Sequence, residues 1–254
     1  MKLGIIGSGF VGSAVANGFS VDTEQVIVDP KFTDNTLEDL EDTEIAFVCV
    51  PTPQQDTHLD VDTSIARGVL TELNKLEYKG VVVVKSTITP HHLKQFKTLY
   101  SNLRLVYNPE FLTEANAVKD YENQNRIILG GPKNETLQLN SIFSKVFPNA
   151  KIINTKSTDA EMVKYTTNSF LAMKVSFANE IYQICKKVNA DYDKVIESTI
   201  EDDRLGTSHW KVPGPDGDFG YGGHCFPKDI NALISVAINN NISPKMLIAT
   251  NEKN

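Results

Sequence analysis

Short apolar runs alternate with longer amphipathic stretches through the first 155 residues of the chain. The runs are nearly all apolar, which is typical of strands that are buried on both faces of a parallel sheet. The stretches between them have a helical period and predict helices that cover the sheet. The pattern predicts strands at Lys2–Ile6, Gln25–Val28, Glu44–Val50, Val81–Val84, Leu103–Tyr107, Arg126–Leu129 and Lys151–Ile153, and helices at Asp62–Leu76 and Glu135–Phe147.

The pattern changes after about residue 155. From Ser157 to about Val188 the chain has a helical period and contains no Gly or Pro, so we predict one long helix. Ser157 or Thr158 could cap its start, with Glu161 as the capping-box partner. A helix of this length often bridges domains or forms a dimer seam, and the alternative is a single core helix. Further helices are predicted at Asp191–Ile200, Pro227–Ala237 and Pro244–Asn254, and a loop rich in Gly and Pro at Arg204–Gly223.

Composition narrows the class of protein. The 254 residues allow one large or two modest domains, and 41% hydrophobic and 22% charged residues are ordinary for a globular chain. A net charge of −7 excludes a general basic field for nucleic acid. We find no signal-peptide pattern and no apolar stretch long enough to span a membrane. Three widely spaced cysteines, Cys49, Cys185 and Cys225, form neither a disulfide framework nor a metal-binding pair. This fits a reducing compartment, so we expect a cytoplasmic protein.

A glycine motif follows the first predicted strand. Gly7 to Gly12 reads GxGxxG, and a small, apolar stretch suited to a helix comes next. The first glycine allows a tight turn, the second lets the backbone approach a pyrophosphate, and the third lets helix and strand pack closely. Asp29 ends the second predicted strand, where an acid accepts hydrogen bonds from a ribose diol and repels a 2′-phosphate. The motif predicts a dinucleotide site that prefers NAD, although the nearby Lys31 keeps NADP open.

A second motif, Gly222-Gly223-His224-Cys225-Phe226-Pro227-Lys228-Asp229, lies near the other end of the chain. It sets Cys225 between a glycine hinge and a Pro-Lys-Asp sequence typical of a helix start. Thiols near a helix N-terminus and a lysine have a lowered pKa, which favours the nucleophilic thiolate. The alternative is a small buried apolar group, which we expect for Cys49 and Cys185.

Polar residues elsewhere are candidates for the same chemistry. Lys164 and Asn168 share a helix face and could contact an oxyanion, or both could be surface residues. Glu110 and Glu114 follow a strand at the sheet edge where ligands bind, and either could activate water or face a helix dipole. Ser86 and Thr87 end the fourth predicted strand, where they could reach a ligand or cap a helix.

Taken together, the motifs resemble those of the nucleotide-sugar dehydrogenases, of the UDP-glucose and GDP-mannose 6-dehydrogenase type. They occur in the family's order over nearly the whole chain, and the run around Cys225 is the most specific. The matching segments are Gly7 to Gly12, Val50 to Pro53, Lys85-Ser86-Thr87, Asn108 to Glu114, Lys164 to Asn168 with Phe170-Leu171-Ala172, Asp203-Arg204 and Gly222 to Asp229.

The resemblance implies the oxidation of a sugar 6-hydroxymethyl group to a carboxylate with two NAD. It makes Cys225 the nucleophile that forms a thiohemiacetal and then a thioester. Lys164 and Asn168 would stabilise oxyanions, Glu110 would assist hydrolysis, and Asp229 with Thr87 would position water. The implied cofactor residues are Gly7, Gly9, Phe10, Val11, Gly12, Asp29, Ser86, Thr87, Glu114 and Lys228, and the implied substrate residues are Glu110, Lys164, Asn168, Arg204, Phe219, Tyr221 and Gly222.

We therefore expect an α/β fold, with a doubly wound, Rossmann-like parallel sheet over residues 1–155 that binds NAD. Residues 156–254 would form a helical catalytic and dimerisation domain, and Arg204 would reach the substrate of the partner in a homodimer. Family chains usually continue into a second nucleotide-binding domain, which this chain would lack. UDP-glucose is the leading substrate among those of the family, although Pro51 stands where many family members that act on UDP-glucose carry asparagine. A two-electron β-hydroxyacid-type dehydrogenase, an NAD-binding remnant and a subunit completed by another chain stay open.

Overall fold

The computed structural model describes residues 1–55 and 60–254. They form two compact units: the first contains Met1–Pro53 and Val61–Lys164, and the second is chiefly Tyr165–Asn254. The division falls inside helix α6 (Ser157–Val188), which has the bounds predicted for the long helix. The domain boundary at 155–156 lies just before this helix and stays a proposal.

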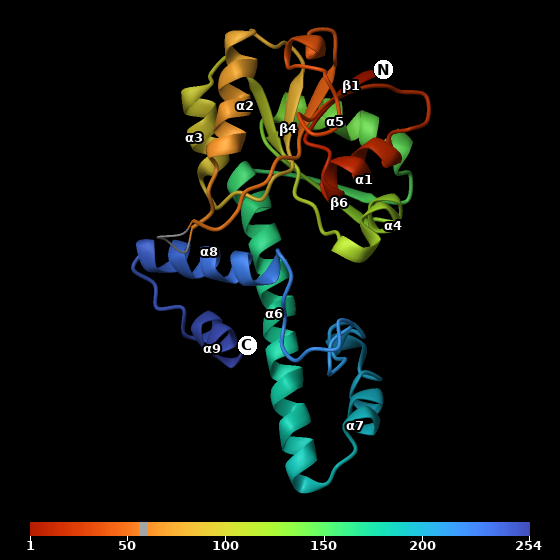
Figure 1. Ribbon diagram of the computed structural model, residues 1–254, viewed down its shortest axis with the longest axis vertical. Coiled ribbons are helices and arrows are strands. Elements are labelled where there is room, and N and C mark those ends of the chain that lie inside the picture. Colours follow the sequence, from red (N-terminus) through yellow and green to blue (C-terminus); the bar gives the residue numbers. More distant parts are fainter. Residues whose placement is uncertain (56–59) are drawn as a thin grey trace. The chain divides into compact units, whose positions relative to one another are not determined.

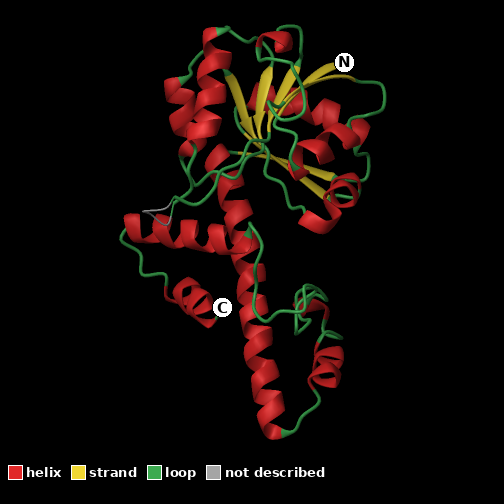
Figure 2. Ribbon diagram, viewed as in Figure 1, coloured by secondary structure: helices red, strands yellow, loops and turns green. Residues whose placement is uncertain are grey.

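The first unit is built on one seven-stranded sheet with the strand order β2-β1-β3-β4-β5-β6-β7 (Figures 1 and 2). Every predicted strand is present, with ends that differ by at most two residues. The chain moves from β1 to one side for β2 and to the other for β3, so the switch point of a doubly wound sheet lies between β1 and β3. The strands are β1 (Lys2–Ile6), β2 (Glu24–Val28), β3 (Ile45–Val48), β4 (Val81–Val84), β5 (Arg104–Tyr107), β6 (Arg126–Gly130) and β7 (Lys151–Thr155).

The sheet is mostly parallel, with one exception. Strands β5 and β6 pair antiparallel, with Tyr107 opposite Gly130. The connection between them, residues 108–125, holds the 3-10 turn η2 (Glu114–Asn116) and helix α4 (Ala117–Glu122). The predicted parallel sheet is therefore mostly parallel, with this one antiparallel pair.

Helices cover both faces of the sheet, as the continuous apolar strands require. Helices α1 (Phe10–Gly18), α4 and α5 (Lys133–Val146) pack on one face, and α2 (Ser64–Lys75) and α3 (His92–Leu99) on the other (Figure 1). The four valines of β4 alternate between the two clusters and are all fully buried. The 3-10 turn η1 (Glu38–Leu40) adds Leu40 to the second cluster.

Glu161, on the first turns of α6, does not complete a capping box. Its two carboxylate oxygens accept hydrogen bonds of 2.9 Å from the N–H groups of His91 and Leu93, at the start of α3. The helix itself begins at Ser157, so the predicted cap is wrong. Glu161 instead accepts from N–H groups that have no acceptor within their own helix, α3, which is distant in sequence.

The second unit is helical. The part of α6 after Lys164 is followed by α7 (Tyr192–Thr199), the 3-10 turn η3 (Asp203–Leu205), α8 (Phe226–Asn239) and α9 (Lys245–Lys253) (Figure 1). One apolar cluster joins α6 to α7 through Ala178, Cys185, Tyr192, Trp210 and Val212. A second joins α6 to α8 through Ala172, Tyr221, Ile230 and Ile234.

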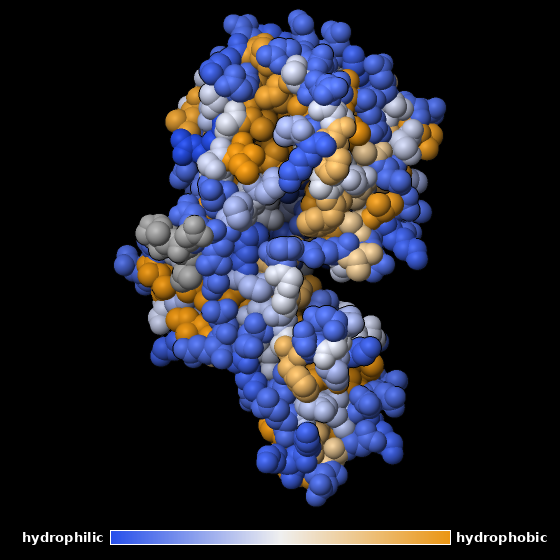
Figure 3. Space-filling model, in the orientation of Figure 1, coloured by the Kyte–Doolittle hydropathy of each residue, from blue (hydrophilic) through white to orange (hydrophobic). Residues whose placement is uncertain are grey.

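Hydrophilic residues cover most of the face seen in the space-filling view, and apolar residues form separate patches (Figure 3). Among the described residues, none of the helices is both long and apolar enough to cross a membrane.

Candidate active site

The glycine motif forms the turn between β1 and α1, and its glycines have three different surroundings. Gly7 has a φ of +90°, and a Cβ there would lie 2.7 Å from the carbonyl oxygen of Cys49. A Cβ on Gly12 would lie 1.9 Å from the carbonyl oxygen of Gly7, so helix and strand pack too closely for any side chain. Around the Cβ position of Gly9 no described atom lies within 4 Å. This open side is where a pyrophosphate can approach the backbone.

The start of helix α1 is suited to an anion. Gly9 caps it without a side-chain hydrogen bond, and the first turn carries no acidic residue. The N–H groups of Phe10, Val11 and Gly12 have no acceptor within the helix, because they belong to its first turn. They and the helix dipole favour a phosphate group at this end.

Asp29 connects the end of β2 to this turn. Its Oδ2 accepts a hydrogen bond of 2.7 Å from Ser8 N, and its Oδ1 accepts one of 2.9 Å from Lys31 N. These two bonds and the charge of Lys31 hold the pKa of Asp29 below its ordinary value, so the carboxylate is ionised at neutral pH. Its remaining lone pairs suit a ribose diol, and its charge opposes a 2′-phosphate. The residues present therefore fit NAD, with Gly7, Gly9, Gly12 and Asp29 as the groups that would hold it.

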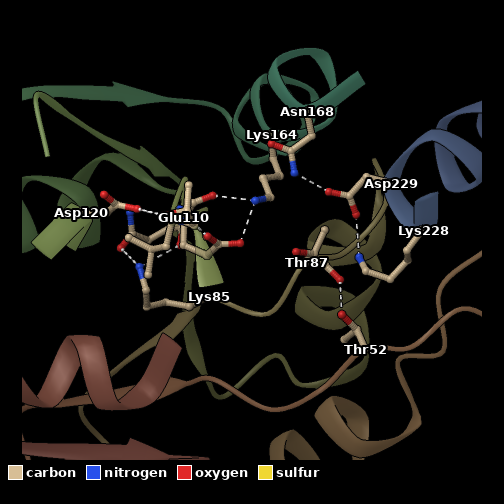
Figure 4. A network of polar contacts seen from close by, with 12 residues as sticks. Thr52, Lys85, Thr87, Glu110, Asp120, Lys164, Asn168, Lys228 and Asp229 are labelled. Carbon is tan, nitrogen blue, oxygen red and sulfur yellow. Dashed lines mark hydrogen bonds and ion pairs between the residues drawn. The ribbon is translucent and has the colours of Figure 1, made fainter. Parts of the chain in front are cut away.

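Residues at the carboxyl end of β4 link neighbouring strands. The Ser86 hydroxyl donates to the carbonyl oxygen of Val50 at 2.7 Å. The Thr52 hydroxyl donates to that of Thr87 at 2.8 Å, as Figure 4 shows. Ser86 is buried and Thr87 is half-buried, whereas Glu114 is exposed at the start of η2. The proposed cofactor roles of Ser86, Thr87 and Glu114 stay predictions.

Glu110 and Lys164 meet in a buried ion pair. Lys164 Nζ lies 2.7 Å from Glu110 Oε1 and 2.7 Å from the carbonyl oxygen of Glu110 (Figure 4). The two side chains are only 4% and 2% exposed. Burial opposes the ionisation of Glu110, but the charge and hydrogen bonds of Lys164, with a bond from Leu112 N, bring its pKa below the ordinary value. The pair can offer a carboxylate and an ammonium group to one reaction.

Sequence reasoning missed two partners of this pair, Lys85 and Asn108. The Lys85 side chain follows β4 and is buried, and its Nζ donates to Asn108 Oδ1 at 2.9 Å (Figure 4). Both residues lie in segments that carry the family resemblance, but no role was predicted for either. The signal available was a lysine placed directly after four consecutive valines, at the edge of the sheet where ligands bind.

The second unit brings together three of the predicted residues. Asn168 Nδ2 donates to Asp229 Oδ2 at 2.6 Å, and Lys228 Nζ lies 2.6 Å from Asp229 Oδ1 (Figure 4). Asp229 is 1% exposed, so both of its oxygens are held within the protein. Lys228, predicted to contact the cofactor, is an ion-pair partner of Asp229 here.

Cys225 occupies the N-cap position of α8. Its carbonyl oxygen accepts the first hydrogen bond of the helix, 2.9 Å from Asp229 N, so the two residues are four apart on one helix. The side chain is half-buried, and none of the three cysteines, all within the described residues, is in a disulfide. Pro227 stands one position further into the helix than predicted, because the helix begins at Phe226.

The loop residues predicted to contact substrate have different surroundings. The Arg204 guanidinium is exposed and paired with Asp202 through both oxygens of the carboxylate. Phe219 is 61% exposed, and the Cβ position of Gly222 is open. Tyr221 is buried, and within the described residues its hydroxyl has no hydrogen-bond partner. This hydroxyl is closed off from solvent, so the predicted contact of Tyr221 with substrate stays a prediction.

A doubly wound sheet with a glycine turn after β1 and an acid after β2 defines a dinucleotide-binding domain of the Rossmann type. Two sequence models of the UDP-glucose/GDP-mannose dehydrogenase family match the chain, the NAD binding domain over residues 29–151 and the central domain over residues 158–254. The chain belongs to this family, which confirms the resemblance predicted from the motifs, and NAD is the cofactor of the domain it contains.

The similar proteins include UDP-glucose 6-dehydrogenases. That of Rickettsia bellii is 35% identical over 231 residues, which cover 88% of this chain and 52% of that protein. That of Haloferax volcanii is 29% identical over 304 aligned positions, covering 100% of this chain and 69% of that protein. A solved UDP-glucose dehydrogenase from Pyrobaculum islandicum has a TM-score of 0.85 at 26% identity and covers 99% of this chain and 68% of that one. The chain spans about half the length of several curated relatives it matches.

Proposed function

We propose that this chain catalyses the NAD-dependent, four-electron oxidation of a nucleotide sugar to the uronate, with UDP-glucose as the leading substrate. The observation that carries the proposal is the hydrogen bond of 2.6 Å between Asn168 and Asp229. It ties helix α6 to helix α8, whose N-cap residue is Cys225. The Cys225 carbonyl oxygen accepts from Asp229 N at 2.9 Å, so the backbone that carries the thiol is joined to the residue that holds the amide. A thiol, an amide and a carboxylate on joined elements suit a reaction through a thiol-bound intermediate.

The first half of the proposed reaction makes an aldehyde and keeps it bound. The sugar C6 hydroxymethyl group loses a proton and a hydride to become an aldehyde. The Cys225 thiolate then adds to the aldehyde carbon, and the carbonyl oxygen becomes the oxyanion of a thiohemiacetal. NAD, when bound, supplies the hydride acceptor for both oxidations, two NAD for each sugar. The covalent bond prevents loss of the half-oxidised sugar between the two oxidations.

In the second half, loss of the second hydride from the thiohemiacetal gives a thioester. Water then adds to the thioester carbon, the carbon–sulfur bond breaks, and the sugar carboxylate leaves with the Cys225 thiol restored. Glu110 would take the proton from that water, and its lowered pKa, which keeps the carboxylate ionised, supports this role. Lys164 and Asn168 would stabilise the oxyanions, charges that develop during the reaction. Asp229, with Thr87, would position the water and the reacting oxygen.

The substrate loop and the partner subunit complete the proposal. Phe219 to Gly223, with Tyr221 among them, would cover the sugar. Arg204, at the surface, would reach the substrate bound by the partner subunit. The resemblance implies that a further domain of such chains recognises much of the nucleotide, so the sugar and base are tested as a panel.

We further propose a homodimer formed through α6. Phe170, Phe177 and Ile184 lie seven residues apart along this helix, and their side chains are 58%, 52% and 49% exposed. Apolar residues repeated every seven positions are typical of a helix seam that packs on another helix. Replacing Phe170 and Phe177 by glutamate should halve the mass measured by light scattering. The matched control is glutamate at Leu137, an apolar residue of α5 that is 50% exposed. An unchanged mass in the double variant would exclude this seam.

The number of NADH formed for each sugar tests the chemistry. The purified chain is incubated with NAD and a panel of UDP- and GDP-sugars, including N-acetylated ones. Two NADH for each sugar supports the thioester route, and one supports a two-electron dehydrogenase. No NADH with any sugar favours a cofactor-binding remnant or a subunit that needs another chain.

The variant Cys225→Ser separates the first two outcomes further. A four-electron enzyme stalls without the thiol, whereas a two-electron enzyme keeps its rate. The control is Cys185→Ser, which changes a buried thiol in a different cluster of the second unit. The cytoplasmic location stays a prediction from the sequence.

A further inference from the structure

Lys85 is a buried cation in the first unit for which the proposed reaction has no role. Its side chain follows β4 and is 2% exposed. Lysine is almost never buried this deeply without a specific partner, because removing its charge from water is costly. The contacts of its ammonium group therefore indicate what it does.

Those contacts lead to the segment that carries Glu110. Lys85 Nζ lies 2.9 Å from Asn108 Oδ1 and 3.4 Å from the carbonyl oxygen of Asn108. The Asn108 amide also donates to the carbonyl oxygen of Ile128 at 2.9 Å, which fixes its orientation. Pro109 alone separates Asn108 from Glu110, so Lys85 anchors the backbone from which the Glu110 side chain extends.

The titratable groups that face Lys85 come from four elements: Cys49 after β3, Tyr121 on α4, Glu110 after β5 and Lys164 on α6. Burial raises the pKa of Cys49 to about 12 and that of Tyr121 well above its ordinary value, so both are neutral at pH 7. Burial lowers the pKa of Lys85 to about 8, which leaves it mostly charged at that pH. At neutral pH the cluster then holds two ammonium groups and one carboxylate, that of Glu110.

We propose that Lys85 is a positioning residue for Glu110. It holds the Asn108–Glu110 segment in place and adds a second positive charge that keeps Glu110 ionised, ready to take a proton from water. This assignment rests on the proposed role of Glu110 in thioester hydrolysis. Lys164 is the direct ion-pair partner of Glu110. When Lys164 turns to an oxyanion, the charge of Lys85 still favours the ionised carboxylate of Glu110.

The experiment is an NMR titration that needs no substrate. The protein is labelled with 13C at glutamate carboxyl carbons, and the Glu110 signal is identified by its loss in Glu110→Gln. We expect Lys85→Met to raise the titration midpoint of Glu110 by about one pH unit, because an opposite charge nearby lowers a carboxyl pKa by that order. The matched control is Lys97→Met, which removes a partly buried lysine of α3 that faces Glu135 and Glu161 instead. An unchanged midpoint in a folded Lys85→Met protein overturns the proposal.

A second measurement on the unaltered chain covers a variant that fails to fold. When Lys85 loses its proton near pH 8, the Glu110 carboxyl signal should show a second inflection at that pH. Its absence also overturns the proposal.

With an active enzyme, Lys85→Met should move the acid limb of the kcat–pH profile to higher pH, with little change in KM. A purely structural role would leave that limb in place. Inactivity of the unaltered chain on every sugar would defeat the proposed function while leaving the titration result valid.

Discussion

The buried Glu110–Lys164 pair gives the sharpest test of the site. Its atoms are 2.7 Å apart and its side chains are 4% and 2% exposed, so neither charge can turn to water. Removing one partner of such a pair costs about 3–5 kcal/mol, because the remaining charge is left buried without compensation. Replacing both partners by apolar residues of similar volume is often close to neutral.

We therefore expect Lys164→Met to lower the free energy of unfolding by about 3–5 kcal/mol at pH 7, and Lys164→Met with Glu110→Leu to recover most of that loss. The assay is urea unfolding followed by circular dichroism. The control is Lys194→Met, which breaks an exposed pair with Asp191 at 3.6 Å and should cost less than about 1 kcal/mol.

The pH dependence of this pair has a definite sign. The folded-state pKa of Glu110 lies below its ordinary value of 4.5, so its contribution is complete above pH 4.5 and is lost as pH falls through the lower value. In Lys164→Met the pKa should rise with burial, so the penalty should shrink as the pH is lowered. The reasoning fails if the double variant loses as much free energy of unfolding as Lys164→Met and Glu110→Leu lose together. It also fails if Lys164→Met costs no more than Lys194→Met.

Three further predictions concern the first unit. Gly12→Ala should reduce NAD affinity at least tenfold by calorimetry, because its Cβ would lie 1.9 Å from the carbonyl oxygen of Gly7; Gly68→Ala, with no described atom within 4 Å, should leave it unchanged. Asp29→Ala should lower the affinity for NAD by roughly tenfold, because a hydrogen bond to a charged group is lost. The same assay should show a smaller preference of the protein for NAD over NADP. The folded-state pKa of Glu161 is raised by burial to about 7, so its ionisation lowers stability as pH rises from 4.5 through 7. Glu161→Gln should flatten this slope in urea unfolding between pH 5 and 8, and an unchanged slope would contradict that pKa.

The sequence predicted the strands and the long helix well because their signals are local. Four consecutive valines identify β4, and α6 lacks any residue that would break a helix. Helix α3 was not predicted, because its start depends on a distant acid. His91 adopts a φ of +80°, and the N–H groups there are bound by Glu161, which lies 70 residues along the chain. Local rules contain no information about that contact.

The same distinction applies to the site. The glycine turn and the start of α8 are read from adjacent residues, so they could be predicted. The position of Lys85 against Asn108 depends on the pairing of β4 with β5, and burial of a lysine cannot be inferred from its neighbours in sequence.

The unbroken course of α6 has a consequence for how such a protein can change. Lys164 and Asn168 are carried by one 32-residue rod, so about 6 Å of helical rise separates their backbones. Loops elsewhere can be lengthened or replaced without altering the spacing of ammonium and amide. The surrounding surface can then diverge while this spacing is inherited intact.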